Sequence, residues 1–193
     1  MTTSERFNQW LDSFLHHLFS RRPVDATFAG FREYNSILPD VTESGLEQTA
    51  SELASLLDRL ASIRREELDH FQRIDYDLAD GFIRTQLWER ASGYFFDINP
   101  TTYTGEAAFG LVSLFVSDFR PAPDKRHDLE ARLSGIPEFL AAARKNLTGA
   151  HPAWIDRAVT ECTGALNFLS KGIPILEEDE GLVVDHESLV FLQ

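Results

Sequence analysis

The sequence predicts an all-α protein, an irregular multi-helix bundle formed by a single domain over residues 1–193. Apolar residues recur at three- and four-residue spacings along most of the chain, which is the pattern of one helix face. Glycine or proline stands at the end of most of these stretches, where helices stop. With 43% apolar residues and 15 Phe among 193 residues, the chain has enough apolar material for one well-filled core.

The first two helices are expected over residues 4–20 and 23–28. Pro23 suits the first turn of a helix, and Gly30 suits a left-handed helix end. The apolar residues of the first stretch share one face: Phe7, Trp10, Leu11, Phe14, Leu15 and Leu18. Residues 31–40 then read as a loop.

Two longer helices are expected over residues 46–63 and 68–91. In the first, six apolar residues keep the helical period: Leu46, Ala50, Leu53, Leu57, Leu60 and Ile63. The second stops near Gly93, and five residues form its expected apolar side: Phe71, Ile74, Leu78, Phe82 and Leu87.

The segment 94–105 is aromatic but is interrupted by Asn99 and Pro100, which predicts a packed connection rather than a strand. Residues 106–119 are apolar on nearly all sides and predict a central helix, with a buried strand as the alternative. Shorter helices follow over residues 124–133 and 137–147, the second with Pro137 in its first turn.

A further helix is expected over residues 152–170, ended by Gly172 and Pro174. The acidic residues 177–180 predict a solvated loop. Residues 187–193 read as the first turns of another helix, with Asp185 as its N-cap. Because no stop signal follows this start, we expect the chain to be truncated at its C-terminus.

Composition limits the partners and the compartment. A net charge of −13 argues against binding to nucleic acid or to anionic membranes, whose phosphates would be repelled. No segment approaches the roughly 20 apolar residues that cross a bilayer, and the N-terminus has no signal-peptide pattern. We therefore expect a cytoplasmic protein. A lone cysteine, Cys162, excludes an internal disulfide framework and reads as a small core residue.

Histidine and carboxylate groupings are the first candidates for chemistry. His186 and Glu187 match the start of a zinc-binding H-E-x-x-H helix, but Val190 stands where the second His is required, so the motif fails. Adjacent His16 and His17 point about 100° apart on a helix and do not easily share one metal. One helix also carries His70 beside four carboxylates, Asp69, Asp75, Asp77 and Asp80, where a solvated face is favoured over a site.

Two other patterns leave alternatives open. The aromatic segment from Tyr94 to Tyr103 suits either the lining of a ligand site or core packing, and core packing is favoured. Asn146 and Thr148 fit the N-glycosylation pattern, which matters only in a secreted eukaryotic protein. No catalytic, cofactor-binding or metal-binding residue is therefore assigned from the sequence.

An ordered set of motifs resembles the N-terminal half of a bacterial family known as domain of unknown function 885. Four segments carry the resemblance: Arg22–Gly30, Ile74–Leu78, Asn99–Tyr103, and Arg132–Pro137 with Asn146 and Leu147. The resemblance implies an all-α fold akin to helical zinc metallopeptidases of the H-E-x-x-H type. It also implies zinc-binding and catalytic residues in a C-terminal half beyond Gln193.

On this resemblance, we expect the N-terminal helical domain of a zinc-dependent, peptidase-like hydrolase. The chain alone would be inactive, with no zinc or other cofactor of its own and with peptides as the substrate class. Its partner would be the missing C-terminal half, or a second copy bound through exposed apolar surface. The alternative is a free-standing helical interaction module without catalytic activity.

Overall fold

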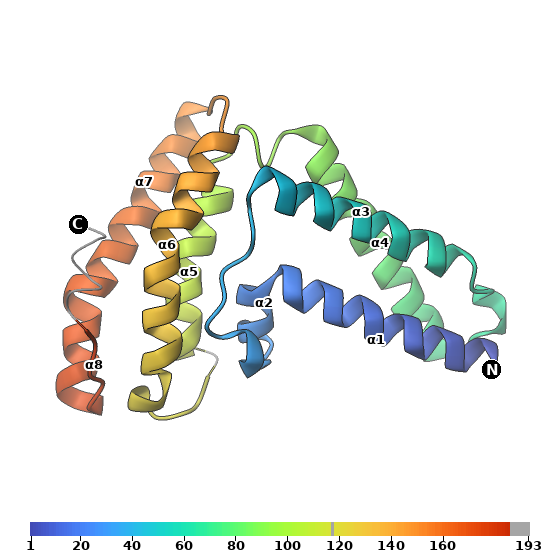
Figure 1. Ribbon diagram of the computed structural model, residues 1–193, viewed down its shortest axis with the longest axis horizontal. Helices are drawn as coiled ribbons and strands as arrows, with labels where there is room; N and C mark the ends of the chain where they lie inside the picture. The colour runs from blue at the N-terminus through green and yellow to red at the C-terminus, as the bar shows by residue number, and fades with distance from the viewer. Residues whose placement is uncertain (117, 186–193) are drawn as a thin grey trace.

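The computed structural model describes residues 1–116 and 118–185, and every regular element within them is helical (Figure 1). This confirms the all-α class. The α-helices are α1 (Thr3–Arg21), α2 (Pro23–Phe28), α3 (Glu43–Ala61), α4 (His70–Ser92), α5 (Thr101–Val116), α6 (Arg126–Asn146), α7 (Pro152–Asn167) and α8 (Ile173–Glu180). Short 3-10 turns cover Arg32–Tyr34, Arg65–Glu67 and Ala122–Lys125, and a π-helical turn covers Phe168–Gly172. Among these described helices, none is both long and apolar enough to span a membrane.

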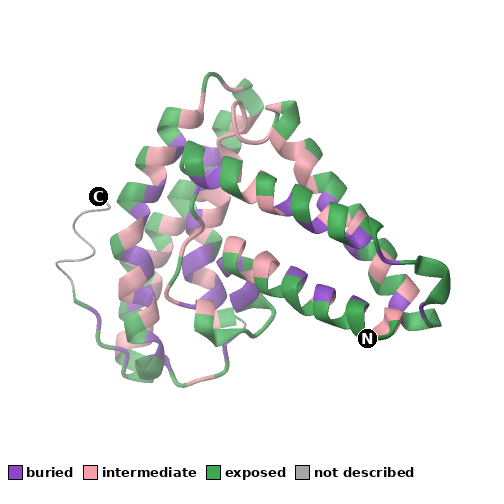
Figure 2. Ribbon diagram, turned by 45° about the vertical axis from the view of Figure 1, so that its right-hand side comes forward, coloured by how far each residue is buried: buried purple, intermediate pink, exposed green. Residues whose placement is uncertain are grey.

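The helices form two groups that meet at α2 (Figure 1). We call α1, α3 and α4 the N-terminal lobe and α5 to α8 the C-terminal lobe. Each lobe has its own apolar cluster, the first centred on Phe7, Leu60 and Ile83 and the second on Leu111, Leu114 and Leu129. Buried residues lie on the inward faces of the helices, while the outward faces are largely exposed (Figure 2).

Local signals explain where the helices begin and end. Thr2 opens α1 with a capping box, because its hydroxyl accepts from the Glu5 N–H at 3.1 Å while the Glu5 carboxylate accepts from the Thr2 N–H at 2.7 Å. At the other end of the N-terminal lobe, α4 stops at Gly93, whose φ of +64° is the left-handed conformation that favours glycine. Gly30 likewise adopts a φ of +93° after α2, as the sequence predicted.

The expected apolar face of α4 is confirmed for Phe82 and Leu87, which pack against the N-terminal cluster, and is wrong for its other three residues. Phe71 is 75% exposed and Leu78 is 66% exposed, whereas Ala79 and Ile83 are buried in the N-terminal lobe. The other end of the buried face is polar, because Gln72 is buried and hydrogen-bonded to side chains of α1. A buried glutamine cannot be recognised from an apolar pattern. Phe71, Ile74 and Leu78 form such a pattern at helical spacing although they are exposed.

This register gives a testable difference between two α4 positions. We expect Ile83→Val to lower the free energy of unfolding by about 0.5–1.5 kcal/mol, because it removes a buried methylene. Leu78→Ala, on the exposed face, is expected to change it by no more than about 0.5 kcal/mol. Urea denaturation of both variants measures this. A larger loss for Leu78→Ala than for Ile83→Val would contradict the register.

The two helices expected over residues 124–133 and 137–147 are one continuous helix, α6. Pro137 lies inside it and offers no N–H to the preceding turn, which weakens the helix locally. The helix continues because side chains on both sides of the proline bury on one face: Leu129, Leu133, Ile136, Phe139 and Ala143. Burial along this face outweighs the missing hydrogen bond.

Two other boundaries differ from the prediction. The central helix α5 begins at Thr101 rather than at residue 106, because the Asn99 side chain accepts from the Thr101 N–H at 3.0 Å and starts the helix there. The acidic residues 177–180 lie in α8 rather than in a loop, because a π-helical turn carries the chain past Gly172, and α8 ends only at Gly181 with a φ of +70°. The helix expected over residues 187–193 lies outside the described residues.

Candidate functional site

A cavity of about 320 Å³ lies where the two lobes meet. Its walls come from the C-terminal end of α1, from α3 and α4, from residues 39–41 before α3, from the aromatic segment and from α5. The exposed surface of the lining is mainly apolar, with polar groups among it: His17, Leu18, Arg21, Arg22, Pro39, Asp40, Val41, Leu46, Thr49, Leu53, Phe82, Gln86, Glu89, Phe95, Phe96, Thr102 and Glu106. Cavities of this kind, with a few polar groups on apolar walls, are typical of small-molecule binding sites.

Glu106 is the acidic residue that α5 contributes to this cavity. Its carboxyl group makes no hydrogen bond or ion pair with the rest of the described chain. The pKa of Glu106 is raised to about 7, mainly by burial and also by the nearby Asp25 carboxylate, while Arg22 and Arg132 oppose the shift. A carboxyl group that titrates near neutrality inside a cavity can bind a cation or exchange a proton.

The α1 side of the cavity carries Arg21 and His17, which share one partner on α3. Arg21 donates from Nε and Nη2 to both oxygens of Glu52 at 2.8–3.0 Å, and His17 Nδ1 lies 3.1 Å from Glu52 Oε2. Burial lowers the pKa of His17, although Glu52 acts in the opposite direction, so we expect a neutral imidazole at neutral pH. The positive charge of Arg21 is thus already matched by Glu52.

Arg22, the other cation of the cavity, is also paired. Its Nε donates to Asp25 Oδ2 at 2.5 Å, its Nη1 donates to Gln86 Oε1 at 3.0 Å, and its Cζ lies 5.7 Å from the centre of the Phe82 ring. Gln86 in turn donates to Glu89 Oε2 at 2.6 Å. These contacts connect the start of α2 to α4 beside the cavity.

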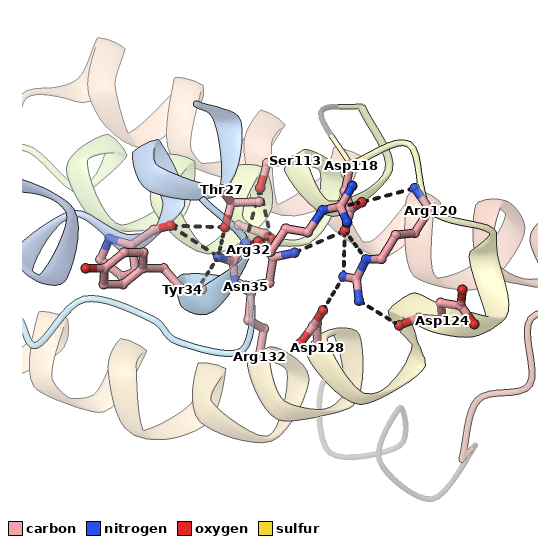
Figure 3. Close-up of polar contacts among 12 residues, drawn as sticks. Thr27, Arg32, Tyr34, Asn35, Ser113, Asp118, Arg120, Asp124, Asp128 and Arg132 are labelled. Carbon is pink, nitrogen blue, oxygen red and sulfur yellow. Dashed lines mark hydrogen bonds and ion pairs between the residues drawn. The ribbon is translucent and has the colours of Figure 1, made fainter. Parts of the chain in front are cut away.

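A fully buried arginine, Arg132 on α6, fixes the junction beside the cavity (Figure 3). Its guanidinium donates to six oxygens: the Thr27 hydroxyl at 2.6 Å, the Ser113 hydroxyl at 3.2 Å, and the carbonyls of Pro23, Tyr34, Ile37 and Gly110. These acceptors belong to α2, to the α2–α3 linker (residues 29–42) and to α5. Burial lowers the pKa of Arg132 to about 10, so the group stays charged at neutral pH.

A second polar cluster lies next to Arg132 and surrounds Asp118 (Figure 3). Asp118 Oδ2 accepts from Arg120 Nε at 2.6 Å and from the Asn35 amide at 3.1 Å, and Arg120 Nη2 also donates to Asp128 at 2.6 Å. Burial acts to raise the pKa of Asp118, but the hydrogen bonds from Arg120 outweigh it and lower the pKa. This cluster connects the linker to the start of α6 and has a structural role.

The structure separates most of the groupings that the sequence offered. His17 lies in the cavity wall, whereas His16 is exposed, so the two do not act together. Asp77 pairs with Arg65 and Asp80 pairs with Arg84, which leaves His70 without a carboxylate cluster. Within residues 1–116 and 118–185, no three His, Cys, Asp or Glu side chains converge in a way that could hold a metal.

Three further candidates have no site around them or cannot be placed. Cys162 lies on α7 outside the core and is exposed as a residue. Partial desolvation of its thiol and the neighbouring Glu161 raise its pKa, which disfavours a reactive thiolate. Asn146 is half-buried and donates to the carbonyl of Val41 at 2.7 Å, so it has a packing role. His186 and Glu187 lie outside the described residues.

The aromatic segment contributes both to the core and to the wall of the cavity. Tyr103 is buried in the C-terminal lobe and donates to the carbonyl of Phe96 at 2.7 Å. Phe95 and Phe96 line the cavity, and Thr102 fixes the segment by donating to the carbonyl of Phe95 at 2.9 Å. Core packing was the favoured interpretation, yet the same segment also supplies cavity walls.

Sequence reasoning missed Glu106, the central residue of this cavity. A signal was present, because Glu106 is the one charged residue between Asp97 and Asp118, inside an otherwise apolar helix. An isolated acid in a helix that must be buried indicates either a paired charge or a functional group. Its partners could not be read from spacing, because the other cavity residues come from α1, α3 and α4.

Comparison with known proteins adds the family context. A family model described as "Bacterial protein of unknown function (DUF885)" matches residues 23–187. The chain is similar to the solved structure of "a putative lipoprotein of unknown function from Shewanella oneidensis", with a TM-score of 0.82 and 25% sequence identity. The match covers 96% of this chain and 33% of that chain, so this chain spans about a third of the length of the similar protein. No curated protein matches the chain.

Proposed function

Because the chain belongs to the bacterial family of unknown function DUF885, we propose that its helices form the substrate-binding wall of a larger hydrolase that acts on peptides. The cavity at the lobe junction carries this proposal, since it places an unpaired Glu106 carboxyl among apolar and aromatic walls. The chain matches only about a third of a longer protein of solved structure, which supports a domain that works together with other parts of a larger protein. Residues beyond these helices would then perform the bond cleavage.

Zinc, the metal implied by the family resemblance, does not fit the described helices. No group of three ligating side chains converges in the described part of the chain. We therefore assign no step of the reaction to a metal bound here. In the proposed enzyme, the zinc site would lie outside these helices, in a part of the larger protein that this chain does not include.

A hydrolysis assay on the protein made from its native gene tests this proposal. We expect it to cleave members of a mixed peptide library, to lose that activity with a zinc chelator and to regain it when zinc is restored. The 193-residue chain alone is expected to cleave none of them. A zinc-loaded gene product that cleaves no peptide, or one that is indifferent to the chelator, would contradict the proposal.

One observation also fits a second candidate function, a helical interaction module without catalytic activity. The outward face of α7 exposes an apolar stripe made of Ile155, Val159 and Leu166. Exposed stripes of this kind mark surfaces that another polypeptide covers. In the proposed hydrolase that polypeptide is the rest of the larger protein, and in the interaction module it is a separate protein or a second copy. The intact mass of the native gene product distinguishes the two. The cytoplasmic location stays a prediction.

A further inference from the structure

The Glu106 carboxyl is the one acidic group of the cavity wall whose partner is missing among the described residues. Asp40 accepts hydrogen bonds from the Thr42 N–H at 2.9 Å and from the Thr42 hydroxyl at 2.7 Å. Glu89 accepts one from Gln86 at 2.6 Å. Glu106 lies on α5, and it is available to a group that enters the cavity.

The charge around this carboxyl favours a cation. The cavity is lined by two arginines and three carboxylic acids. Arg21 is tied to Glu52, and Arg22 is tied to Asp25, two carboxylates that are not themselves part of the lining. His17 is held by Glu52 as well. With both lining arginines matched from outside, the three lining acids leave the lining itself with an excess of negative charge. Arg132 beside the cavity also acts on Glu106, but its guanidinium donors are held by oxygens of α2, the linker and α5. The net charge of −13 attracts cations from solution.

The walls next to the polar groups are aromatic and aliphatic. Phe82, Phe95 and Phe96 line the cavity together with the aliphatic side chains of Val41 and Leu46. An aromatic wall attracts a cation by its negative ring face and also covers an apolar body. The cavity therefore suits a ligand with one positive end and one apolar part.

We propose that the cavity binds a primary ammonium group attached to an apolar body, with the Glu106 carboxylate as its counter-ion and the phenylalanine rings as its walls. This inference rests on the proposed function for the identity of the natural ligand, which would be a peptide with a free amine. Either an N-terminal α-ammonium or a lysine side chain would supply the same chemistry.

Isothermal titration calorimetry of the 193-residue chain at about pH 8 tests the inference, with benzylamine as the probe. We expect benzylamine to bind at least about tenfold more tightly than the neutral benzyl alcohol, because a charge left unpaired in a buried site is costly. Glu106→Gln is expected to lower the affinity for benzylamine by at least about tenfold. Glu47→Gln, which removes an exposed carboxylate outside the cavity, is the matched control and should leave the affinity unchanged.

Phenylalanine amide and Nα-acetyl-lysine amide distinguish the two sources of the ammonium group, and binding of either one supports the inference. Absence of benzylamine binding to the wild-type chain would overturn it. Equal affinity for benzyl alcohol would overturn it too, and this comparison requires no variant to fold. If Glu106→Gln binds benzylamine as tightly as the wild type, and circular dichroism shows that its helicity is retained, Glu106 is not the counter-ion and the inference is overturned. Because the assay measures binding and not cleavage, amine binding without peptide hydrolysis would refute the proposed function alone.

Discussion

Replacing Arg132 with alanine is expected to lower the free energy of unfolding by about 3–5 kcal/mol. The change removes the donor for six oxygens of α2, the α2–α3 linker and α5, and it leaves a buried void. Carbonyls such as those of Pro23 and Gly110 would lose a partner where water has little access. No longer burying the guanidinium charge offsets part of this loss, but the lost hydrogen bonds and the void outweigh it.

Chemical denaturation of Arg132→Ala and of a matched variant measures this effect. Arg144 lies on the same helix and is exposed, so Arg144→Ala should change the free energy of unfolding by no more than about 0.5 kcal/mol. Arg132→Lys keeps the charge but offers three donors without the planar guanidinium geometry. Its loss of unfolding free energy should therefore fall between those of Arg132→Ala and Arg144→Ala. Equal losses for Arg132→Ala and Arg144→Ala would show that the junction does not depend on Arg132.

Glu106→Gln is expected to stabilise the protein in a pH-dependent manner. Folding raises the pKa of Glu106 from 4.5 to about 7, so the folded protein holds a proton that the unfolded chain releases in this interval. The wild-type protein therefore loses stability as the pH rises from about 4.5 through 7. Glutamine imitates the neutral carboxyl group and avoids this loss. Its advantage should be near zero at pH 4 and reach at most about 3 kcal/mol at pH 8 or above.

The surroundings of Glu106 set the size of this effect. Burial is the main cause of the raised pKa, Asp25 on α2 adds to it, and Arg22 and Arg132 reduce it. The other charged or titratable groups of the cavity are Arg21, His17, Asp40 and Glu89. Urea denaturation at pH 5 and pH 8 of the wild type, Glu106→Gln and the control Glu47→Gln isolates the contribution of Glu106. The same difference between wild type and Glu106→Gln at both pH values would mean that Glu106 ionises normally.

The sequence predicted the elements that depend on local signals. Pro23 and Gly30 bound α2 as expected, and Gly93 ends α4, because proline at a first turn and glycine at a left-handed end act without tertiary help. Continuous apolar residues likewise revealed α5 as central, and it packs against α2, α6 and α7. These features are encoded within a few residues of one another.

Features that depend on residues far apart in the sequence could not be predicted. The buried face of α4 includes Gln72, whose burial depends on partners in α1. The continuity of α6 through Pro137 depends on burial against the C-terminal lobe. The cavity around Glu106 combines segments from α1 to α5 that only the fold brings together. Sequence reasoning accordingly assigned no site residue, although the isolated charge of Glu106 was visible.

Carbon-detected NMR titration of the Glu106 carboxyl, assigned by comparison with Glu106→Gln, tests the central claim most directly. The claim is that the lobe junction holds an unpaired carboxyl group that receives a ligand ammonium. We expect the resonance of the free chain to titrate with a pKa of about 7. Saturation with benzylamine should lower that pKa, because an adjacent cation stabilises the ionised form. A pKa near 4.5 in the free chain, or a pKa that benzylamine does not move, would contradict the account.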